Sequence, residues 1–254
     1  MPIPHSPNKL FQPSLLRATE VLANMGKALD LDVRPTSAIL TYQSSIIHAI
    51  SKQYQLTPLV GLYGDVHWVG PQNRGLVVAS NFGIGAPTAT VMMENLIALG
   101  VTKIISVGIA GSISIKHPIG DIVVCSKALR DEGTSYHYLP DEKFVSPSEG
   151  LTSSLMTSLH SKWQSPSVGP TWTTDAPYRE TKLELDHYRT EGICTVDMEA
   201  AALFAVGIYR QIEVAAAFSI SDVADEHGWQ FAPDNRKPHA SLLSLFKAAV
   251  RTLS

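Results

Sequence analysis

The chain has 254 residues, of which 44% are hydrophobic and 17% charged, and its formal net charge at pH 7 is −3. These values are ordinary for a globular protein and exclude a disordered chain. A charge balance without a positive excess argues against nucleic acid or an anionic membrane as the partner. The N-terminus lacks a basic segment followed by an apolar run, and no run of about 18 apolar residues occurs, so we expect a cytoplasmic protein with no transmembrane helix.

The first third of the chain predicts one long helix followed by short strands and a second helix. Apolar residues at helical spacing predict a helix over residues 8–31, and Pro35 comes after its end. A strand is expected at 38–40 and a helix at 44–54. Turn residues such as Gly64-Asp65 separate three further strands, which are expected at residues 59–62, 66–69 and 76–80.

The clearest unit of the sequence lies between residues 75 and 107. An apolar strand at 75–80 leads through a glycine-rich turn to a helix at 86–99, and a second apolar strand follows at 103–107. Continuous apolar strands joined through a helix are typical of parallel pairing in an α/β fold. The turn Gly83-Ile84-Gly85 lacks the third glycine of a dinucleotide-binding loop, because position 88 is a threonine, so no nicotinamide cofactor is expected.

The remainder of the chain continues to alternate strands and helices. Strands are expected at residues 122–125, 167–174 and 214–220, and helices at 151–162, 182–190, 198–209 and 239–253. We see no internal repeat and no linker rich in glycine, serine or proline. The sequence therefore predicts one α/β domain over residues 1–254.

Two segments with carboxylates are candidates for chemistry. Asp222 follows an apolar strand, at the edge of the sheet where α/β folds bind ligands, and burial there would raise its pKa and let it protonate a leaving group. Capping a turn is the structural alternative for Asp222. Asp197 and Glu199 precede an apolar helix, whose dipole and cap explain Asp197. Glu199 precedes a run that we expect to be buried on most faces, and a buried carboxylate needs a hydrogen-bond partner such as a sugar diol.

Together these segments resemble the superfamily of nucleoside phosphorylases and nucleosidases, which includes uridine phosphorylase and purine nucleoside phosphorylase. The resemblance spans residues 36–253, and its segments occur in the family's order. They are residues 83–87, 103–111, 130–138, 174–181, 196–204 and 221–222.

The resemblance implies a three-layer α/β/α fold of the phosphorylase/hydrolase type, with a central mixed sheet and a distorted barrel. It also implies a homo-oligomer, a dimer or a hexamer, in which subunit interfaces complete the sites. His5 resembles the N-terminal histidine that some members lend to the neighbouring subunit's sugar, whereas a disordered terminus is the alternative.

The resemblance further implies roles for individual residues. Glu199 would bind the ribose hydroxyls, with Met198 packed against the sugar and Ile84 nearby. Asp197 takes the position of the first acid in the family's Glu-Met-Glu motif. Asp222 matches the aspartate that protonates or hydrogen-bonds the departing base in purine-acting members, and Ser221 precedes it in the same segment. An acid at this position favours a purine-type base over uracil.

The chain departs from the family where phosphate would bind. Phosphorolytic members generally have a Gly-Asp-Pro-x-x-Arg loop, which here reads Leu40-Thr41-Tyr42-Gln43-Ser44-Ser45, and an arginine and a hydroxyl residue where this chain has Ser106 and Ile109. A phosphate dianion is usually held by arginine and hydroxyl donors. Arg130 and Arg179 are candidate substitutes, and surface ion pairs are their structural alternative.

The sequence therefore predicts an enzyme that cleaves the N-glycosidic bond of a nucleoside, with a role in purine salvage and without a metal or cofactor. Phosphorolysis to free base and ribose or deoxyribose 1-phosphate ranks first, with phosphate as the co-substrate. Hydrolysis by water ranks second, because the expected phosphate ligands are missing. A nucleoside-binding protein with reduced catalysis ranks third.

Overall fold

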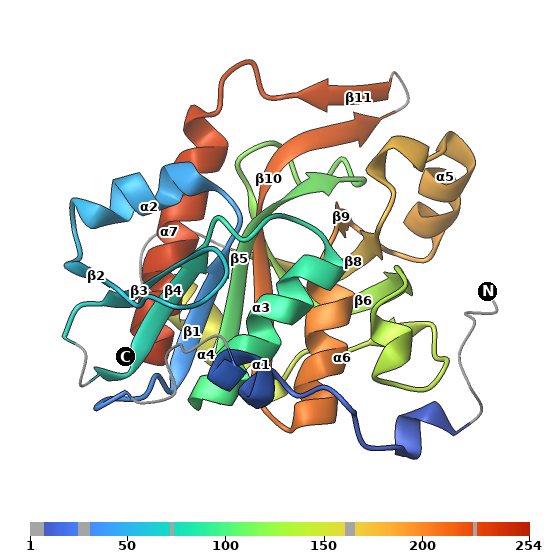
Figure 1. Cartoon of the computed structure of the whole chain (residues 1–254). Coiled ribbons are helices and arrows are strands. Elements are labelled where there is room, and N and C mark those ends of the chain that lie inside the picture. Colours follow the sequence, from blue (N-terminus) through green and yellow to red (C-terminus); the bar gives the residue numbers. More distant parts are fainter. Residues whose placement is uncertain (1–7, 25–30, 72–73, 161–165, 226–227) are drawn as a thin grey trace.

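The computed structural model describes residues 8–24, 31–71, 74–160, 166–225 and 228–254 (Figure 1). The predicted binding residue His5 lies outside these residues. Within them, eleven strands form one mixed sheet. The strands are β1 (Ser37–Thr41), β2 (Leu56–Pro58), β3 (Asp65–Val69), β4 (Leu76–Ser80), β5 (Lys103–Ser112), β6 (Ile122–Asp131), β7 (Phe144–Val145), β8 (Ser167–Thr174), β9 (Thr195–Asp197), β10 (Glu213–Asp225) and β11 (Gly228–Phe231).

Five of the eleven strands close part of the sheet into a ring. Strand β10 pairs with both β5 and β6, and β8 and β9 connect β6 back to β5, so these five strands form a ring. Strands β1, β4, β3 and β2 extend the sheet outward from β5. A ring of strands places the ends of β5, β9 and β10 next to one another, and the candidate site lies there.

Helices cover both faces of the sheet. Helices α1 (Ala18–Asn24), α3 (Ala86–Leu99) and α6 (Ala200–Arg210) pack on one face, with Leu22, Met92 and Phe204 in a common buried cluster. Helices α2 (Ser44–Ser51), α4 (Glu149–His160) and α7 (Arg236–Leu253) pack on the other, around Ile46, Leu155 and Phe246. The predicted three-layer α/β/α fold with a mixed sheet is confirmed (Figure 1). The prediction of a single domain over residues 1–254 stays a prediction.

The remaining helices are short or lie at the rim of the ring. Helix α5 (Lys182–Thr190) begins with a capping box between Thr181 and Glu184. The single-turn 3-10 helices are η1 (Lys9–Phe11), η3 (Ser135–His137) and η4 (Pro177–Arg179). No helix of the described residues is long and apolar enough to cross a membrane.

Several predicted elements are confirmed to the residue. Helices α3 and α5 and strand β8 have the predicted bounds. The reason for α3 is local, because Pro87 lies in its first turn and Gly100, with φ of 117°, forms its C-cap.

The predicted N-terminal helix over residues 8–31 is wrong at its start. Helix α1 begins at Ala18 and not at residue 8, and Pro13 lies between it and η1. Proline lacks the N–H that an interior helical position needs. The apolar residue Leu15, which contributed to the helical pattern, is fully exposed.

The strand predicted at residues 59–62 is also wrong. The observed edge strand β2 ends at Pro58, and the next residues turn toward β3 with Val60 largely exposed. Proline is tolerated at the edge of a sheet because no neighbour needs its N–H.

Strands β5 and β10 run further than predicted. The strand predicted at residues 103–107 continues through Gly108–Gly111 to Ser112, because β10 pairs alongside this segment, with one register shift between Ile220 and Asp222. Asp222 was expected in a loop and instead lies within β10. A parallel neighbour satisfies the backbone hydrogen bonds of both segments, so glycine and polar residues do not end these strands.

Candidate active site

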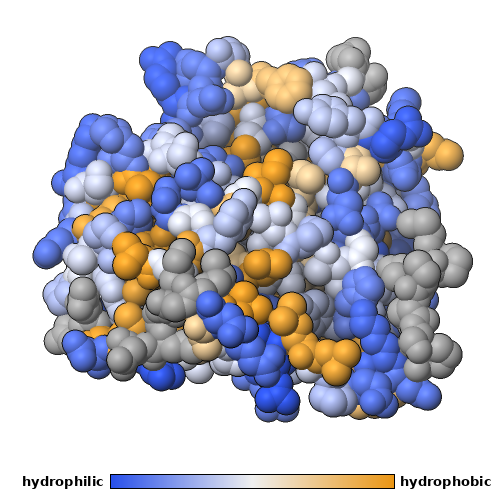
Figure 2. All heavy atoms as spheres, in the orientation of Figure 1, coloured by the Kyte–Doolittle hydropathy of each residue, from blue (hydrophilic) through white to orange (hydrophobic). Residues whose placement is uncertain are grey.

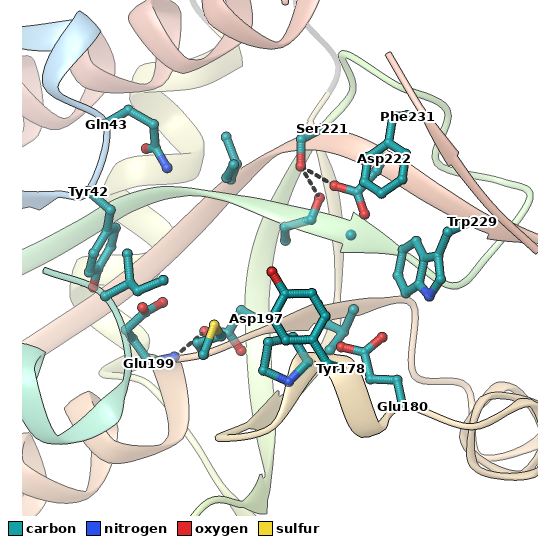
Figure 3. A pocket seen from close by; sticks show the side chains of 17 residues that line it. Tyr42, Gln43, Tyr178, Glu180, Asp197, Glu199, Ser221, Asp222, Trp229 and Phe231 are labelled. Atoms are coloured by element: carbon teal, nitrogen blue, oxygen red, sulfur yellow. Dashed lines mark hydrogen bonds between the residues drawn. The ribbon is translucent and has the colours of Figure 1, made fainter.

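A pocket of about 360 Å³ opens where the ends of β5, β9 and β10 meet. This volume suits a small-molecule ligand. Figure 3 shows Tyr42, Gln43 and Glu199 on one side of the pocket and Asp222, Trp229 and Phe231 on the other. The predicted residues Ile84, Asp197, Met198, Glu199, Ser221 and Asp222 all line it.

Asp197 lies at the end of β9 and caps helix α6. Its carboxylate accepts hydrogen bonds from the backbone N–H groups of Glu199 and Ala200, at 2.9 and 2.7 Å. It also accepts from the hydroxyls of Thr173 and Thr171, at 2.7 and 3.2 Å. With both oxygens engaged inside the protein, Asp197 fixes the start of α6 and thereby the position of Glu199.

Glu199 is the N-cap residue of α6 and is 9% exposed. The N–H of Gly85 donates to its Oε1 at 2.6 Å. Gly85 has a φ of 95°, which only glycine adopts readily, and it is the N-cap residue of α3. Burial, together with the charge of Asp197, raises the pKa of Glu199 to about 8. The glycine-rich turn thus places one oxygen of Glu199 and leaves hydrogen-bonding capacity for a ligand.

Asp222 owes its position to an irregularity in β10. The register between β10 and β5 shifts between Ile220 and Asp222. A bulge of this kind re-aims side chains, and here it turns Ser221 and Asp222 toward the pocket. The Ser221 hydroxyl bonds to the Asp222 carboxyl and to the carbonyl of Ala110. Burial raises the pKa of Asp222, which favours its protonated form.

Glu180 is a pocket residue that the sequence did not single out. It follows η4, and burial together with the charge of Asp222 raises its pKa to about 7. The negative charge of Asp222 thus acts on Glu180, which keeps its proton to a higher pH than an ordinary glutamate does. A signal is present in the sequence, since Glu180 belongs to the segment 174–181 that carries the family resemblance.

Aromatic side chains of β11 form the wall next to Asp222. A Cβ atom at Gly111 would lie 2.8 Å from the Trp229 ring, so the absence of a side chain at Gly111 lets the indole pack against β5. Phe231 and Tyr178 also line the pocket and are largely exposed at its mouth. The sequence did not identify Trp229 and Phe231, because their place depends on the β10–β11 hairpin.

The predicted substitute cations are not in the pocket. The Arg130 guanidinium donates to Ser135 Oγ at 2.9 Å and to the carbonyl of Pro140 at 2.6 Å, and it stacks on Tyr136. Buried and bonded in this way, it holds the loop after β6 and does not reach a phosphate in the pocket. Arg179 is exposed on η4 and is not among the pocket-lining residues. Neither arginine lines this chain's own pocket, and the substrate-binding role of both stays a prediction.

Next to Glu199, the part of the pocket near β1 carries the neutral side chains of Tyr42 and Gln43. The Tyr42 hydroxyl lies 3.0 Å from Ser106 Oγ, and its ring makes an edge-on contact with Phe82. Burial and the charge of Glu199 raise the pKa of Tyr42 well above its usual value, so the phenol stays neutral. Among the described residues that line the pocket, four are acids and none is lysine, arginine or histidine. The part of the chain that is described holds no cluster of three or more residues that could bind a metal ion.

A model of the Phosphorylase superfamily matches residues 47–250 of the chain. Guanosine phosphorylase of Halorubrum lacusprofundi is 28% identical over 138 residues. The aligned region covers 54% of this chain and 57% of that enzyme, so the chain spans little more than half the length of this relative.

Solved structures have the same fold. The structure of uridine phosphorylase from Vibrio fischeri ES114 has a TM-score of 0.72 at 23% identity, and the match covers 87% of this chain and 91% of that one. The structure of AMP nucleosidase from Bacteroides thetaiotaomicron has a TM-score of 0.71 at 24% identity, and the match covers 93% and 98% of the two chains.

Proposed function

The chain belongs to the phosphorylase superfamily, and from this premise we propose that it is an enzyme that breaks the N-glycosidic bond of a nucleoside. One observation carries the proposal. A single pocket presents the Glu199 carboxyl on one side and, on the other, the Asp222 carboxyl, whose pKa is raised by burial. Sugar binding and protonation of the base require groups of these two kinds, separated by the width of the substrate.

The two carboxyl groups have different roles in this proposal. Glu199 binds the ribose hydroxyls and fixes the ring, while Met198 packs against the sugar. As the C1′–N bond breaks, the bonding electrons move to the base nitrogen, and Asp222 donates a proton there. The sugar passes through an oxocarbenium-like state, so neutralising the departing base lowers the barrier. Asp197 takes no part in the bond changes and holds Glu199 in place.

We propose a purine-type base as the leaving group. Asp222 and Glu180 place two carboxyl groups on the base side of the pocket, and Trp229 offers a flat apolar wall. A purine has ring nitrogens that accept a proton from an acid, and its two fused rings fill an aromatic slot better than a single ring. A role in purine salvage is part of this proposal.

Two nucleophiles are candidates for the attack on the sugar, namely phosphate and water. The name of the guanosine phosphorylase relative supports phosphate, which would give ribose 1-phosphate. The uncharged side of the pocket supports water, because the described lining residues include no cation to bind a phosphate dianion. Neither candidate needs a cofactor.

The test is a substrate panel. Inosine, adenosine, guanosine, methylthioadenosine and uridine are incubated with the protein, with and without phosphate, and the free base is measured. We expect base release from at least one purine nucleoside and little from uridine. Saturable nucleoside binding without release of any base would instead identify a binding protein and contradict the proposal.

We further propose that the chain forms a homo-oligomer, a dimer or a hexamer. Apolar side chains are exposed around the pocket mouth, where Ile84 is 63% and Phe231 74% exposed. Others are exposed on the face that carries α1 and α3, where Figure 2 shows separate apolar patches among hydrophilic residues. A second copy would cover such surface. The cytoplasmic location stays a prediction from the sequence.

A further inference from the structure

We propose that Thr173 on strand β8 is a positioning residue for Glu199, because its hydroxyl caps helix α6 and so leaves the Glu199 carboxyl free to bind the sugar. The inference rests on the proposed sugar-binding role of Glu199. Thr173 itself is fully buried and is not among the described residues that line the pocket. It therefore acts on the substrate only through its neighbours.

The start of α6 lacks the bond that an N-cap side chain usually makes. The first N–H groups of a helix have no partner within the helix, and the side chain of the N-cap residue commonly accepts one of them. Glu199 is the N-cap residue of α6, yet its side chain makes no such bond. Since α6 begins inside the protein, its first N–H groups need other acceptors.

Two side chains from neighbouring strands supply these acceptors. Asp197 Oδ2 accepts a hydrogen bond from the N–H of Glu199 at 2.9 Å (Figure 3) and one from the N–H of Ala200 at 2.7 Å. The next N–H group, that of Ala201, donates to Thr173 Oγ1 at 3.1 Å. These bonds satisfy the start of α6 without the Glu199 carboxyl, which is left to face the pocket.

The direction of its hydrogen bonds gives the Thr173 hydroxyl a second role. Parallel pairing of β8 with β9 places Thr173 opposite Asp197. The amide of Ala201 can only donate, so the Thr173 hydroxyl turns its own hydrogen to Asp197 Oδ1, 2.7 Å away. Thr171 donates to the same oxygen at 3.2 Å. Asp197 thus accepts from four donors, which a carboxyl group does with both oxygens only when it is ionised.

The ionised Asp197 in turn acts on the proton of Glu199. Burial, together with the charge of Asp197, raises the pKa of Glu199 to about 8. At neutral pH the Glu199 carboxyl therefore keeps its proton and can both donate and accept a hydrogen bond. Each hydroxyl of a ribose diol also donates and accepts, so this carboxyl group is suited to the 2′- and 3′-hydroxyls together.

The variant Thr173→Val removes both roles while it keeps the shape of the side chain. The N–H of Ala201 loses its acceptor, and Asp197 loses one of its donors. The Glu199 carboxyl then becomes the nearest substitute acceptor for the start of α6, in competition with the sugar. We expect the contact with the ribose hydroxyls to weaken.

The experiment compares a purine ribonucleoside that the protein cleaves with its 2′-deoxy form. In Thr173→Val, kcat/KM should fall about tenfold for the ribonucleoside and less than about threefold for the deoxynucleoside, which has one hydroxyl fewer to lose. A purely structural role of Thr173 would lower both values by the same factor. Thr173→Ser keeps the hydroxyl and should restore the wild-type ratio of the two values. An unchanged ratio in folded Thr173→Val would overturn the inference.

Thr90→Val is the matched control, because Thr90 is a buried threonine of α3 whose hydroxyl has no hydrogen-bond partner within the protein. It should keep the wild-type ratio. Thermal unfolding checks that the variants are folded. If Thr173→Val does not fold, Thr171→Val replaces it, since Thr171 also donates to Asp197. The ratio should shift in the same direction, and an unchanged ratio would again overturn the inference.

The wild-type protein separates the two levels of the argument. Release of base by the wild type, with an unchanged ratio in Thr173→Val, contradicts this inference and leaves the proposed cleavage intact. A wild-type protein that releases no base from any nucleoside contradicts both.

Discussion

Asp222 tests the proposed chemistry at the scale of one residue. Asp222→Asn keeps the shape and removes the acidic proton. Positioned acids contribute about 10²–10⁴-fold, so kcat for a purine nucleoside should fall by that factor while KM changes little. The measurement is steady-state kinetics of base release. Asp32→Asn, at an exposed site, is the control, and an Asp222→Asn enzyme with the wild-type rate would exclude the proposed role.

The raised pKa of Glu180 leads to a prediction of how kcat/KM depends on pH. Burial and the charge of Asp222 raise the pKa of Glu180 to about 7, so the pair holds one proton below that pH and loses it above. The reaction uses this proton, so kcat/KM should fall about tenfold per pH unit above pH 7.

The variant Glu180→Gln tests whether the Glu180–Asp222 pair causes the fall in kcat/KM above pH 7. In Glu180→Gln, Asp222 titrates without a charged neighbour, so the falling part of the pH–rate profile should move to lower pH. Glu149→Gln removes an exposed acid at the start of α4 and should leave the profile in place. If the profile of Glu180→Gln coincides with that of the wild type, the two carboxyl groups do not share a proton.

Among the secondary-structure elements, helix α6 packs especially closely against strand β10 of the sheet. A Cβ atom at Gly207 would lie 2.5 Å from Val214 Cγ2 on β10, so the glycine permits the contact between helix and sheet. Gly207→Ala should destabilise the protein by about 1–3 kcal/mol through overpacking, although alanine is the better helix former. Urea unfolding measures this free energy.

Gly150 provides the matched control within α4. A Cβ atom there meets nothing closer than 3.9 Å, so Gly150→Ala should leave the stability unchanged or raise it by less than about 1 kcal/mol. If the two variants were equally stable, β10 would have moved to make room for the added methyl group at Gly207, and the predicted overpacking would be absent.

Strands β5 and β10 explain at the same scale why the site was only partly predictable. The motif residues Glu199 and Asp222 were recognisable, because each carboxylate lies next to an apolar segment in the sequence. The bulge that aims Asp222 was not, because it depends on register with a strand that is distant in the sequence. Glu180 and Trp229 were missed for the same reason, since each becomes part of the pocket only through packing.

The association state is a prediction at the scale of the whole molecule. Exposed apolar residues at the pocket mouth, including Tyr178 at 99% exposure, lead us to expect a dimer or larger oligomer. Sedimentation velocity at the protein concentration used for the activity assay measures it. A monomer with full activity under those conditions would contradict the proposal that a second copy covers the mouth.

By itself the sequence determined the fold class, because apolar periodicity and helix-end signals act locally and are readable in order along the chain. It also determined the two carboxyl groups that carry the proposed bond cleavage. The tertiary structure decided what surrounds them. It placed Arg130 in a structural loop and Arg179 outside the pocket, and it put Tyr42, Gln43 and Ser106 together. Hydrogen bonds and burial join residues that are far apart in the chain, and these contacts decide which side chains line the pocket.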